Sequence, residues 1–315
     1  MNILVTGCCG FIGSNLIKKL LKDGYSVIGI DNFLLGSYKN ISNISSKNFK
    51  FFEINIAEEE SISHLERYLN DEHEINEIWH LAANSDIQRG NQDSNIDLKN
   101  TFLSTYYLLE FAKRNNVKKF HFASSSAVYG DHGEKKLDEL SSPLLPISNY
   151  GSMKLASEAI ISAATEQFLD FSFIYRFPNV VGLPMTHGIL FDFFKKIEND
   201  NTILEVLGDG TQQKLYLHVD DLIDAMVTIK KHSRSKYNII NIGPDDDGIS
   251  VKSIAELFKK LTNGNFIINY GKNNFGWPGD VPKFNYDISK IKNFGWIPKL
   301  GSLQAIKKTI SDSIG

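Results

Sequence analysis

A tyrosine and a lysine in the stretch YGSMK, Tyr150 and Lys154, have the spacing of a pair that acts together in acid–base chemistry. They are four residues apart at the expected start of a helix, so their side chains share one face. A nearby ammonium group and a helix N-terminus both favour a phenolate, and the sequence therefore predicts a lowered pKa and a general-base role for Tyr150. The stretch YDISK repeats the spacing at Tyr286 and Lys290, but we expect no strand before it and therefore ordinary helix surface there.

A run of three serines, 124–126, begins where a buried strand is expected to end. Carboxyl ends of parallel strands meet at one edge of a sheet, and such sheets bind their ligands there. Tyr150 follows the middle serine by 25 residues. A serine hydroxyl at this edge can share a hydrogen bond with the substrate oxygen that Tyr150 deprotonates.

Three glycines, Gly7, Gly10 and Gly13, stand between the first expected strand and the first expected helix. In such a turn glycine permits the sharp bend, lets backbone approach a pyrophosphate, and allows the helix to pack on the strand, with the phosphates at the helix N-terminus. Asp31 ends the next expected strand. A carboxylate there accepts hydrogen bonds from the ribose hydroxyls and repels a 2′-phosphate, so the pattern predicts NAD rather than NADP.

Short apolar runs alternate with amphipathic stretches through the first half of the chain, which predicts strands and crossover helices. Strands are expected at 2–7, 26–31, 49–55, 77–83, 118–126 and 171–177, and helices at 11–24, 58–70, 97–116 and 150–168. After about residue 177 the rhythm loosens, with a helix at 189–200 and strands at 204–208 and 237–243. We expect a Rossmann-type α/β fold: an NAD-binding domain of residues 1–176, rejoined by 217–243, and a smaller substrate-binding region of 177–216 and 244–315.

Composition excludes several classes of function. The 315 residues are 42% hydrophobic with a formal net charge of -3, so no basic surface for nucleic acid is expected. No apolar run reaches the roughly 18 residues of a membrane span, and the N-terminus lacks a cationic signal-peptide region. We therefore expect a cytoplasmic protein. The two cysteines, Cys8 and Cys9, are adjacent and lack metal-ligand spacing, so no metal is expected.

Taken in order along the chain, these landmarks resemble the extended short-chain dehydrogenase/reductase family. The resemblance is to its NAD-dependent nucleotide-sugar epimerases and dehydratases, and in particular to a UDP-glucose 4-epimerase-like subgroup. It covers nearly the whole chain and rests on the stretches TGCCGFIG, IDN, HLAA, SSSAVYG, YGSMK, RFPNVVG, LGDGTQQKLYLHVDD and GDVPKFNYDISKIKNFGWIP.

The resemblance implies roles for individual residues. Tyr150 is the catalytic base, Lys154 holds the nicotinamide ribose and tunes Tyr150, and Ser125 is the hydroxyl partner, with Ser124 and Ser126 as alternatives one residue away. The implied NAD contacts are Gly7, Gly10, Phe11, Ile12, Gly13, Asp31, Asn32, Asn55, Ile56, Leu81, Ala82, Ala83, Tyr150 and Lys154. The implied substrate contacts are Ser125, Ser126, Asn179, Lys214 and Trp277.

Four positions depart from the family pattern. Asn55 stands where an aspartate commonly reads the adenine amino group, and Thr101 replaces a common helix asparagine. Lys214 and Trp277 stand where many relatives carry phosphate-binding arginines, and an indole cannot form the bidentate pair that a guanidinium gives a phosphate. The nucleotide of the substrate is therefore open between UDP and GDP.

The residues after Ser125 bear on the reaction. A 4,6-dehydratase of this family typically carries Asp-Glu there, whereas this chain has Ser126 and Ala127, which cannot do that acid–base work. We expect a 4-epimerase that acts through a 4-keto intermediate, with a C4 dehydrogenase as the alternative and a 4,6-dehydratase or a noncatalytic NAD-binding protein as less favoured ones.

Two apolar-striped helices, 97–115 and 150–168, resemble the pair that forms a dimer interface in relatives, so a homodimer is expected. Their apolar side chains at Leu108, Phe111, Ile160 and Ala164 could equally belong to the core.

Overall fold

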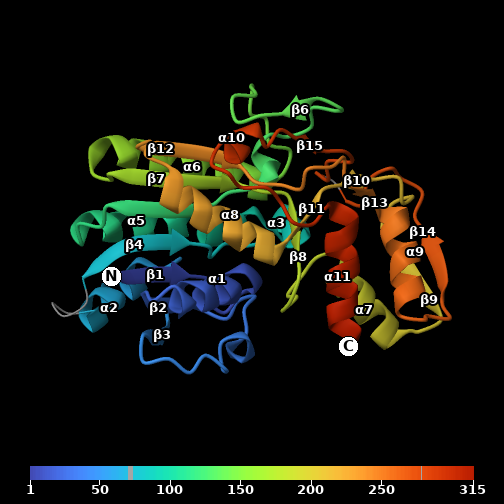
Figure 1. Ribbon diagram of the computed structural model, residues 1–315, viewed down its shortest axis with the longest axis horizontal. Helices are drawn as coiled ribbons and strands as arrows, with labels where there is room; N and C mark the ends of the chain where they lie inside the picture. Colours follow the sequence, from blue (N-terminus) through green and yellow to red (C-terminus); the bar gives the residue numbers. More distant parts are fainter. Residues whose placement is uncertain (70–73, 278) are drawn as a thin grey trace.

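A seven-stranded parallel sheet forms the centre of the computed structural model, which describes residues 1–69, 74–277 and 279–315 (Figure 1). The strand order is β12-β7-β5-β4-β1-β2-β3, and every neighbouring pair is parallel. The strands are β1 (Asn2–Thr6), β2 (Ser26–Asp31), β3 (Phe49–Glu53), β4 (Ile75–His80), β5 (Lys119–Ala123), β7 (Phe171–Arg176) and β12 (Tyr237–Asn241). The chain builds outward from β1 in both directions, which confirms the Rossmann-type fold and places the switch point for ligand binding between β1 and β4.

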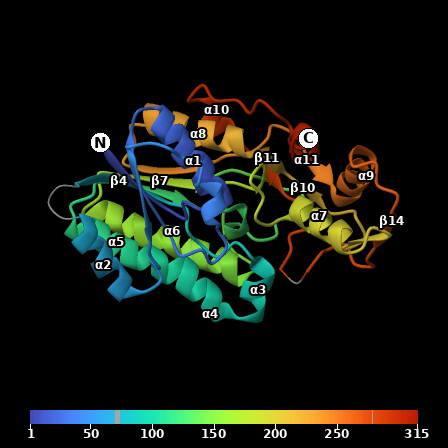
Figure 2. The ribbon, with the colours of Figure 1, turned by 90° about the horizontal axis from the view of Figure 1, so that it is seen from below.

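Helices cover both faces of this sheet. In Figure 2, α1 (Phe11–Lys22) and α8 (Val219–His232) lie on one face. On the other face lie α2 (Glu59–Leu69), α5 (Ser104–Arg114) and α6 (Asn149–Gln167). The helix expected at 58–70 is α2, and its last predicted residue, Asn70, lies outside the described residues. Within the described part of the chain, no helix is long and apolar enough to cross a membrane.

The sheet separates two hydrophobic cores, which explains why its strands are mostly apolar on both faces. Ile3 and Val5 of β1 belong to the core under α1 and α8, whereas Leu4 between them belongs to the core under α2, α5 and α6. Successive side chains of a strand point to opposite faces, so a strand covered on both sides is apolar at most of its positions.

The helix expected at 97–116 is interrupted. Residues Leu98–Leu103 form a wider π-helical turn, η2, and α5 begins only at Ser104. The hydroxyls of Ser104 and Thr105 both donate to the carbonyl oxygen of Thr101, at 3.2 and 2.7 Å. Side-chain donors that compete for a main-chain acceptor bend or widen a helix, and apolar periodicity does not register them.

Most elements after residue 177 form a second, smaller region beyond the carboxyl ends of the sheet strands, at the side of Figure 1 where α7, α9 and α11 stand. They pack around a third hydrophobic core of their own. The main elements of this region are β8 (Asn179–Val181), α7 (Ile189–Asn199), β9 (Ile203–Val206), β11 (Tyr216–His218), α9 (Val251–Leu261), β14 (Ile267–Tyr270) and α11 (Ser302–Ile314), with the short strands β10 (Gln213–Lys214) and β13 (Ile249–Ser250). Short elements elsewhere in the chain are η1 (Tyr38–Asn40), α3 (Ile87–Gln92), α4 (Ser94–Asp97), η3 (Ser126–Val128), β6 (Lys136–Leu137), β15 (Asn285–Tyr286) and α10 (Ser289–Lys292).

The strand expected at 237–243 returns to the main sheet as its edge strand β12, parallel to β7. β11 does not reach that sheet, because it pairs with β8. Its last two residues fall in the range 217–243 that the sequence assigns to the NAD-binding domain. The domain boundaries themselves stay a prediction.

Two sequence interpretations change with the structure. Leu108, Phe111 and Ala164 are buried in the core under α5 and α6, and Ile160 is partly buried against it, so these four side chains are core residues. The YDISK stretch is not surface helix at its tyrosine, because Tyr286 is 4% exposed and lies in β15, paired with β6.

Candidate functional site

A cavity of about 790 Å³ opens at the carboxyl ends of the sheet strands and extends between the sheet and the smaller region. Its wall brings together every residue that the sequence assigns to a site. On the cofactor side these are Gly7, Gly10, Phe11, Ile12, Gly13, Asp31, Asn32, Asn55, Ile56, Leu81, Ala82 and Ala83. On the substrate side they are Ser125, Ser126, Tyr150, Lys154, Asn179, Lys214 and Trp277.

The glycine turn before α1 has no room for side chains. Gly7 has φ +67, and a Cβ on Gly13 would lie 2.0 Å from the carbonyl oxygen of Gly7. Helix α1 begins at Phe11 after the N-cap Gly10, with no side-chain cap and no acidic residue in its first turn. Within the described residues no partner is found for the N–H groups of Phe11, Ile12 and Gly13, which line the cavity, and the helix dipole favours an anion there.

Asp31 lies at the end of β2 with 9% of its surface exposed. Its carboxylate accepts the N–H of Cys9 at 2.9 Å and that of Phe33 at 2.8 Å. Burial raises the pKa of this carboxyl, and the main-chain N–H groups oppose the shift. The side chain is thus fixed in the cavity wall with lone pairs to spare for further donors.

Asn55 is more fully engaged. Its side-chain oxygen already accepts from Asn32 at 3.0 Å and from the N–H of Ala57 at 3.2 Å. An amide oxygen has two lone pairs, so reading an adenine amino group would require one of these contacts to give way.

The adjacent cysteines are both free and fully buried, with their sulfurs 3.7 Å apart. The ligand atoms of Cys8, Cys9 and Asp31 lie within 4.8 Å of one another, which is close enough to share a metal ion. Burial strongly raises the pKa of the Cys8 thiol, however, and only a thiolate is a good metal ligand.

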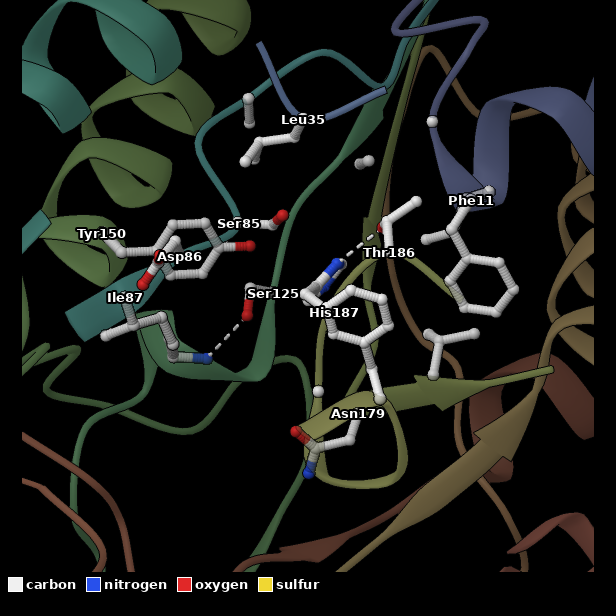
Figure 3. A pocket seen from close by; sticks show the side chains of 18 of the residues that line it. Phe11, Leu35, Ser85, Asp86, Ile87, Ser125, Tyr150, Asn179, Thr186 and His187 are labelled. Carbon is white, nitrogen blue, oxygen red and sulfur yellow. Dashed lines mark hydrogen bonds between the residues drawn. The ribbon is translucent and has the colours of Figure 1, made fainter. Parts of the chain in front are cut away.

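Tyr150 and Ser125 lie beside each other in the cavity wall (Figure 3). Ser125 caps η3 by accepting the N–H of Ala127 at 3.2 Å, which fixes its rotamer. Burial raises the pKa of Tyr150 to about 12, and the neighbouring Ser125 hydroxyl opposes that shift. The sequence prediction of a lowered pKa is therefore wrong for the protein as described, because removal from water outweighs the helix terminus and the nearby lysine.

Lys154 lies one helical turn further along α6, 2% exposed. Its ammonium donates to the carbonyl oxygen of Ala123 at 2.6 Å and lies 5.7 Å from the centre of the Tyr150 ring. Burial lowers the pKa of Lys154 to about 7, with the carboxylates of Asp97 and Glu158 acting in the opposite direction. The group is thus poised between charged and neutral forms near physiological pH.

A buried ion pair supports this edge of the sheet from behind. Arg176, at the end of β7, donates to both carboxylate oxygens of Glu158 on α6, at 3.0 and 2.6 Å. Ser124 donates to the same carboxylate at 2.5 Å. The hydroxyl of Ser124 is therefore held in the protein interior. Its neighbour Ser125 is the residue whose side chain lies beside Tyr150.

The far end of the cavity contains the residues assigned to the nucleotide diphosphate. Lys214 forms an ion pair with Asp280 at 2.5 Å and also donates to the carbonyl oxygen of Val281. The indole N–H of Trp277 is buried and has no partner among the described residues. Asn179, at the start of β8, donates to the carbonyl oxygen of Leu215 at 3.4 Å. This end therefore offers one paired cation and one free donor.

The family model described as NAD dependent epimerase/dehydratase matches residues 3–243. The chain belongs to this family. Its resemblance to the extended short-chain dehydrogenases is thereby confirmed. A dTDP-D-glucose 4,6-dehydratase of Homo sapiens is 29% identical over 98% of this chain and 88% of its own. A UDP-glucuronate 4-epimerase of Thermodesulfobacterium geofontis is 28% identical over 98% and 94%.

Solved structures of related epimerases share the whole fold. A UDP-glucose 4-epimerase of Thermotoga maritima, solved with UDP-glucose, has a TM-score of 0.87 and 28% identity, covering 100% of both chains. A UDP-glucuronic acid 4-epimerase of Bacillus cereus, solved with UDP-glucuronic acid and NAD, has a TM-score of 0.84 and 29% identity, covering 99% of this chain and 100% of its own.

NAD is the cofactor of the family, and the residues of this chain fit it. The glycine turn packs tightly against backbone at Gly7 and Gly13, and the N-terminus of α1, which has no side-chain cap, can receive the pyrophosphate. The carboxylate of Asp31 in the cavity wall can accept hydrogen bonds from the ribose hydroxyls.

Sequence reasoning missed part of the wall. Ser85, Asp86 and Ile87, directly after β4, and Thr186 and His187 before α7 also line the cavity (Figure 3). The polar residues that follow HLAA at a strand end are a signal that could have pointed to the first group. The second group lies in an irregular segment, whose place over the cavity depends on tertiary packing.

Proposed function

We propose that this family member is an NAD-dependent nucleotide-sugar 4-epimerase. The observation that carries the proposal is the pair of hydroxyls of Ser125 and Tyr150 in the cavity, beside the buried amine of Lys154 and with Ser126 and Ala127 next to them. The likeness to 4-epimerases over the whole chain supports it.

In the proposed reaction Tyr150 removes the proton from the C4 hydroxyl of the sugar while Ser125 holds the oxygen by a hydrogen bond. Bound NAD supplies a reversible hydride acceptor. The pKa of about 12 means that Tyr150 rests as a phenol, so it must first release its proton to water before it can act as the base. Protonated Lys154, whose ammonium lies 5.7 Å from the ring centre, would stabilise the resulting phenolate. The product of this half reaction is a 4-keto sugar.

Epimerisation follows if the keto sugar turns over in the cavity and regains hydride on its other face, with Tyr150 returning the proton. If the keto sugar leaves instead, the enzyme is a C4 dehydrogenase. Elimination toward a 4,6-dehydratase product is less favoured, although such enzymes are among the relatives, because Ser126 and Ala127 supply no carboxyl group beside Ser125. UDP and GDP stay open as the nucleotide.

Proton NMR tests the proposal on purified protein loaded with NAD and given a panel of UDP- and GDP-sugars. We expect inversion at C4 without accumulation of NADH. Stoichiometric NADH and a released ketone would identify the dehydrogenase instead. Tyr150→Phe should abolish turnover while NAD stays bound, and unchanged turnover in this variant would refute Tyr150 as the base.

A homodimer and a cytoplasmic location complete the proposal. Helices α5 and α6 remain the expected dimer interface, through outward side chains such as Tyr106, which is 44% exposed, rather than through the four core residues named from the sequence. Sedimentation velocity checks the dimer.

A further inference from the structure

Asp86 is an acidic side chain in the cavity wall that the proposed reaction does not use. It follows β4 and caps α3, because its Oδ1 atom accepts the N–H of Arg89 at 3.0 Å. Figure 3 shows it on the same side of the cavity as Ser125 and Tyr150, across from Phe11. Asp86 thus faces the space around the reacting hydroxyls, where the sugar of a nucleotide sugar must lie.

No positive side chain balances Asp86. Within residues 1–69, 74–277 and 279–315, no ion pair to its carboxylate is found. His187, which also lines the cavity, hydrogen-bonds with Thr186 at 2.9 Å. The ring is exposed at the cavity wall; desolvation there lowers its pKa against the charges of Asp86 and Asp192, and an imidazole with the ordinary pKa of about 6.5 is already mostly neutral at pH 7.

The lysines that line the cavity are committed elsewhere. Lys154 donates to the main chain beneath Tyr150, and Lys214 is paired with Asp280 at the nucleotide end. Lys195 lies over the ring of Phe191, 4.4 Å from its centre, and Lys196 donates to the carbonyl oxygen of Glu205. The sugar end of the cavity therefore keeps an unbalanced negative charge.

We propose that Asp86 makes the sugar end of the cavity selective for hexoses without a carboxylate and so excludes uronic acids. The inference rests on the proposed function, because it assumes a nucleotide sugar with C4 at Tyr150. It separates this chain from its relative solved with UDP-glucuronic acid. Repulsion built against one competitor is a common source of specificity.

The expected degree of discrimination against uronic acids follows from the repulsion between two negative charges. Two unit charges about 6 Å apart at an effective dielectric constant of about 20 repel each other enough to lower relative binding by about 100-fold. A uronate in this cavity would face Asp86 without a compensating cation. We therefore expect kcat/KM for UDP-glucose to exceed that for UDP-glucuronate by about 100-fold or more.

Asp86→Asn is the informative variant, because it removes the charge and keeps the cap. Asparagine caps a helix as well as aspartate does, so α3 should stay formed. Asp93→Asn is the matched control: Asp93 caps α4 in the same way, accepting the N–H of Asn95 at 3.0 Å, but lies outside the cavity wall. The 100-fold preference should fall at least about tenfold in Asp86→Asn and stay unchanged in Asp93→Asn.

Binding to NAD-loaded Tyr150→Phe protein, measured by calorimetry with UDP-glucose and UDP-glucuronate, gives a readout that needs no turnover. Equal affinity for the two sugars would overturn the inference, and so would an Asp86→Asn change that leaves the preference intact. Inversion of both sugars at equal rates by the unaltered enzyme would overturn the inference but leave the proposed function standing. Preferential binding of UDP-glucose without any C4 inversion would support the inference about Asp86 but overturn the proposed 4-epimerase function.

Discussion

Replacing Lys154 by methionine should raise the free energy of unfolding of the protein without NAD. The same substitution should abolish catalysis by the protein with NAD bound. Lys154 is 2% exposed, and its ammonium has one hydrogen-bond acceptor, the carbonyl oxygen of Ala123. Burial lowers its pKa from 10.5 to about 7, even with Asp97 and Glu158 opposing the shift. Each pKa unit corresponds to about 1.36 kcal/mol, so holding this group protonated below pH 7 costs the folded state about 5 kcal/mol.

The sign of the pH dependence follows from proton binding. Between pH 7 and 10.5 the unfolded chain holds a proton on this lysine that the folded chain has released, so the free energy of unfolding rises with pH in that window. From pH 6 to pH 9 the gain is about 3 kcal/mol. Methionine has similar length and no charge, and it forfeits only a charged hydrogen bond of about 1.5–3 kcal/mol. We expect the free energy of unfolding of Lys154→Met to exceed that of the unaltered protein by about 2–4 kcal/mol at pH 6.

Urea unfolding of both proteins at pH 6, 7.5 and 9, without NAD, measures this difference. The advantage of Lys154→Met should shrink by about 3 kcal/mol between pH 6 and 9. Lys113→Met, at an exposed position on α5, is the control and should show no such trend. A Lys154→Met protein that is less stable at pH 6, or whose advantage does not depend on pH, would refute the assignment of Lys154 as a strained buried cation.

Two further substitutions test the cofactor site and the core. Asp31→Asn removes the charge that should repel a 2′-phosphate, so the affinity for NADP should rise at least about tenfold relative to the affinity for NAD. Fluorescence titration measures both affinities. An unchanged ratio of the two would contradict the assigned contact of Asp31 with the ribose. Burial raises the pKa of Glu77, but the charges of His121 and Lys230 outweigh it and hold the pKa at about 2. This lowered pKa stabilises the protein above pH 4.5, and the stabilisation disappears as pH falls toward 2. Glu77→Gln should lose about 3–5 kcal/mol at pH 7, measured by urea unfolding, and show less acid sensitivity between pH 4.5 and 2.

The sheet was predictable because its strands need both faces apolar, and β1 shows why: Leu4 enters one core while Ile3 and Val5 enter the other. The glycine turn was predictable for a similar reason, since few residues fit where a Cβ on Gly13 would meet a carbonyl oxygen. These features depend on local chemistry that the sequence states directly. The π-helical turn at Leu98–Leu103 depends on hydroxyls that compete for one carbonyl, and apolar spacing does not reveal that competition.

The electrostatic state of the site was not predictable, because it depends on burial. Spacing placed Lys154 beside Tyr150, and charge alone would lower the pKa of the phenol. Packing removes Lys154 from water and Tyr150 in part, which lowers the pKa of Lys154 and raises that of Tyr150. Desolvation acts on whichever form is charged, so it moves an acid and a base in opposite directions. The size of these two pKa shifts depends on how α6 packs against the sheet.

The three consecutive serines show how distant residues determine a local role. Ser124, Ser125 and Ser126 are chemically alike, and the sequence distinguishes them only through register. The carboxylate of Glu158 takes the hydroxyl of Ser124, and Arg176 at the end of β7 fixes that carboxylate from the other side. With the first serine held inward, the strand end turns the next hydroxyl into the cavity beside Tyr150. The position of the proposed catalytic serine therefore depends on a buried ion pair between two side chains, Glu158 and Arg176, that do not line the cavity.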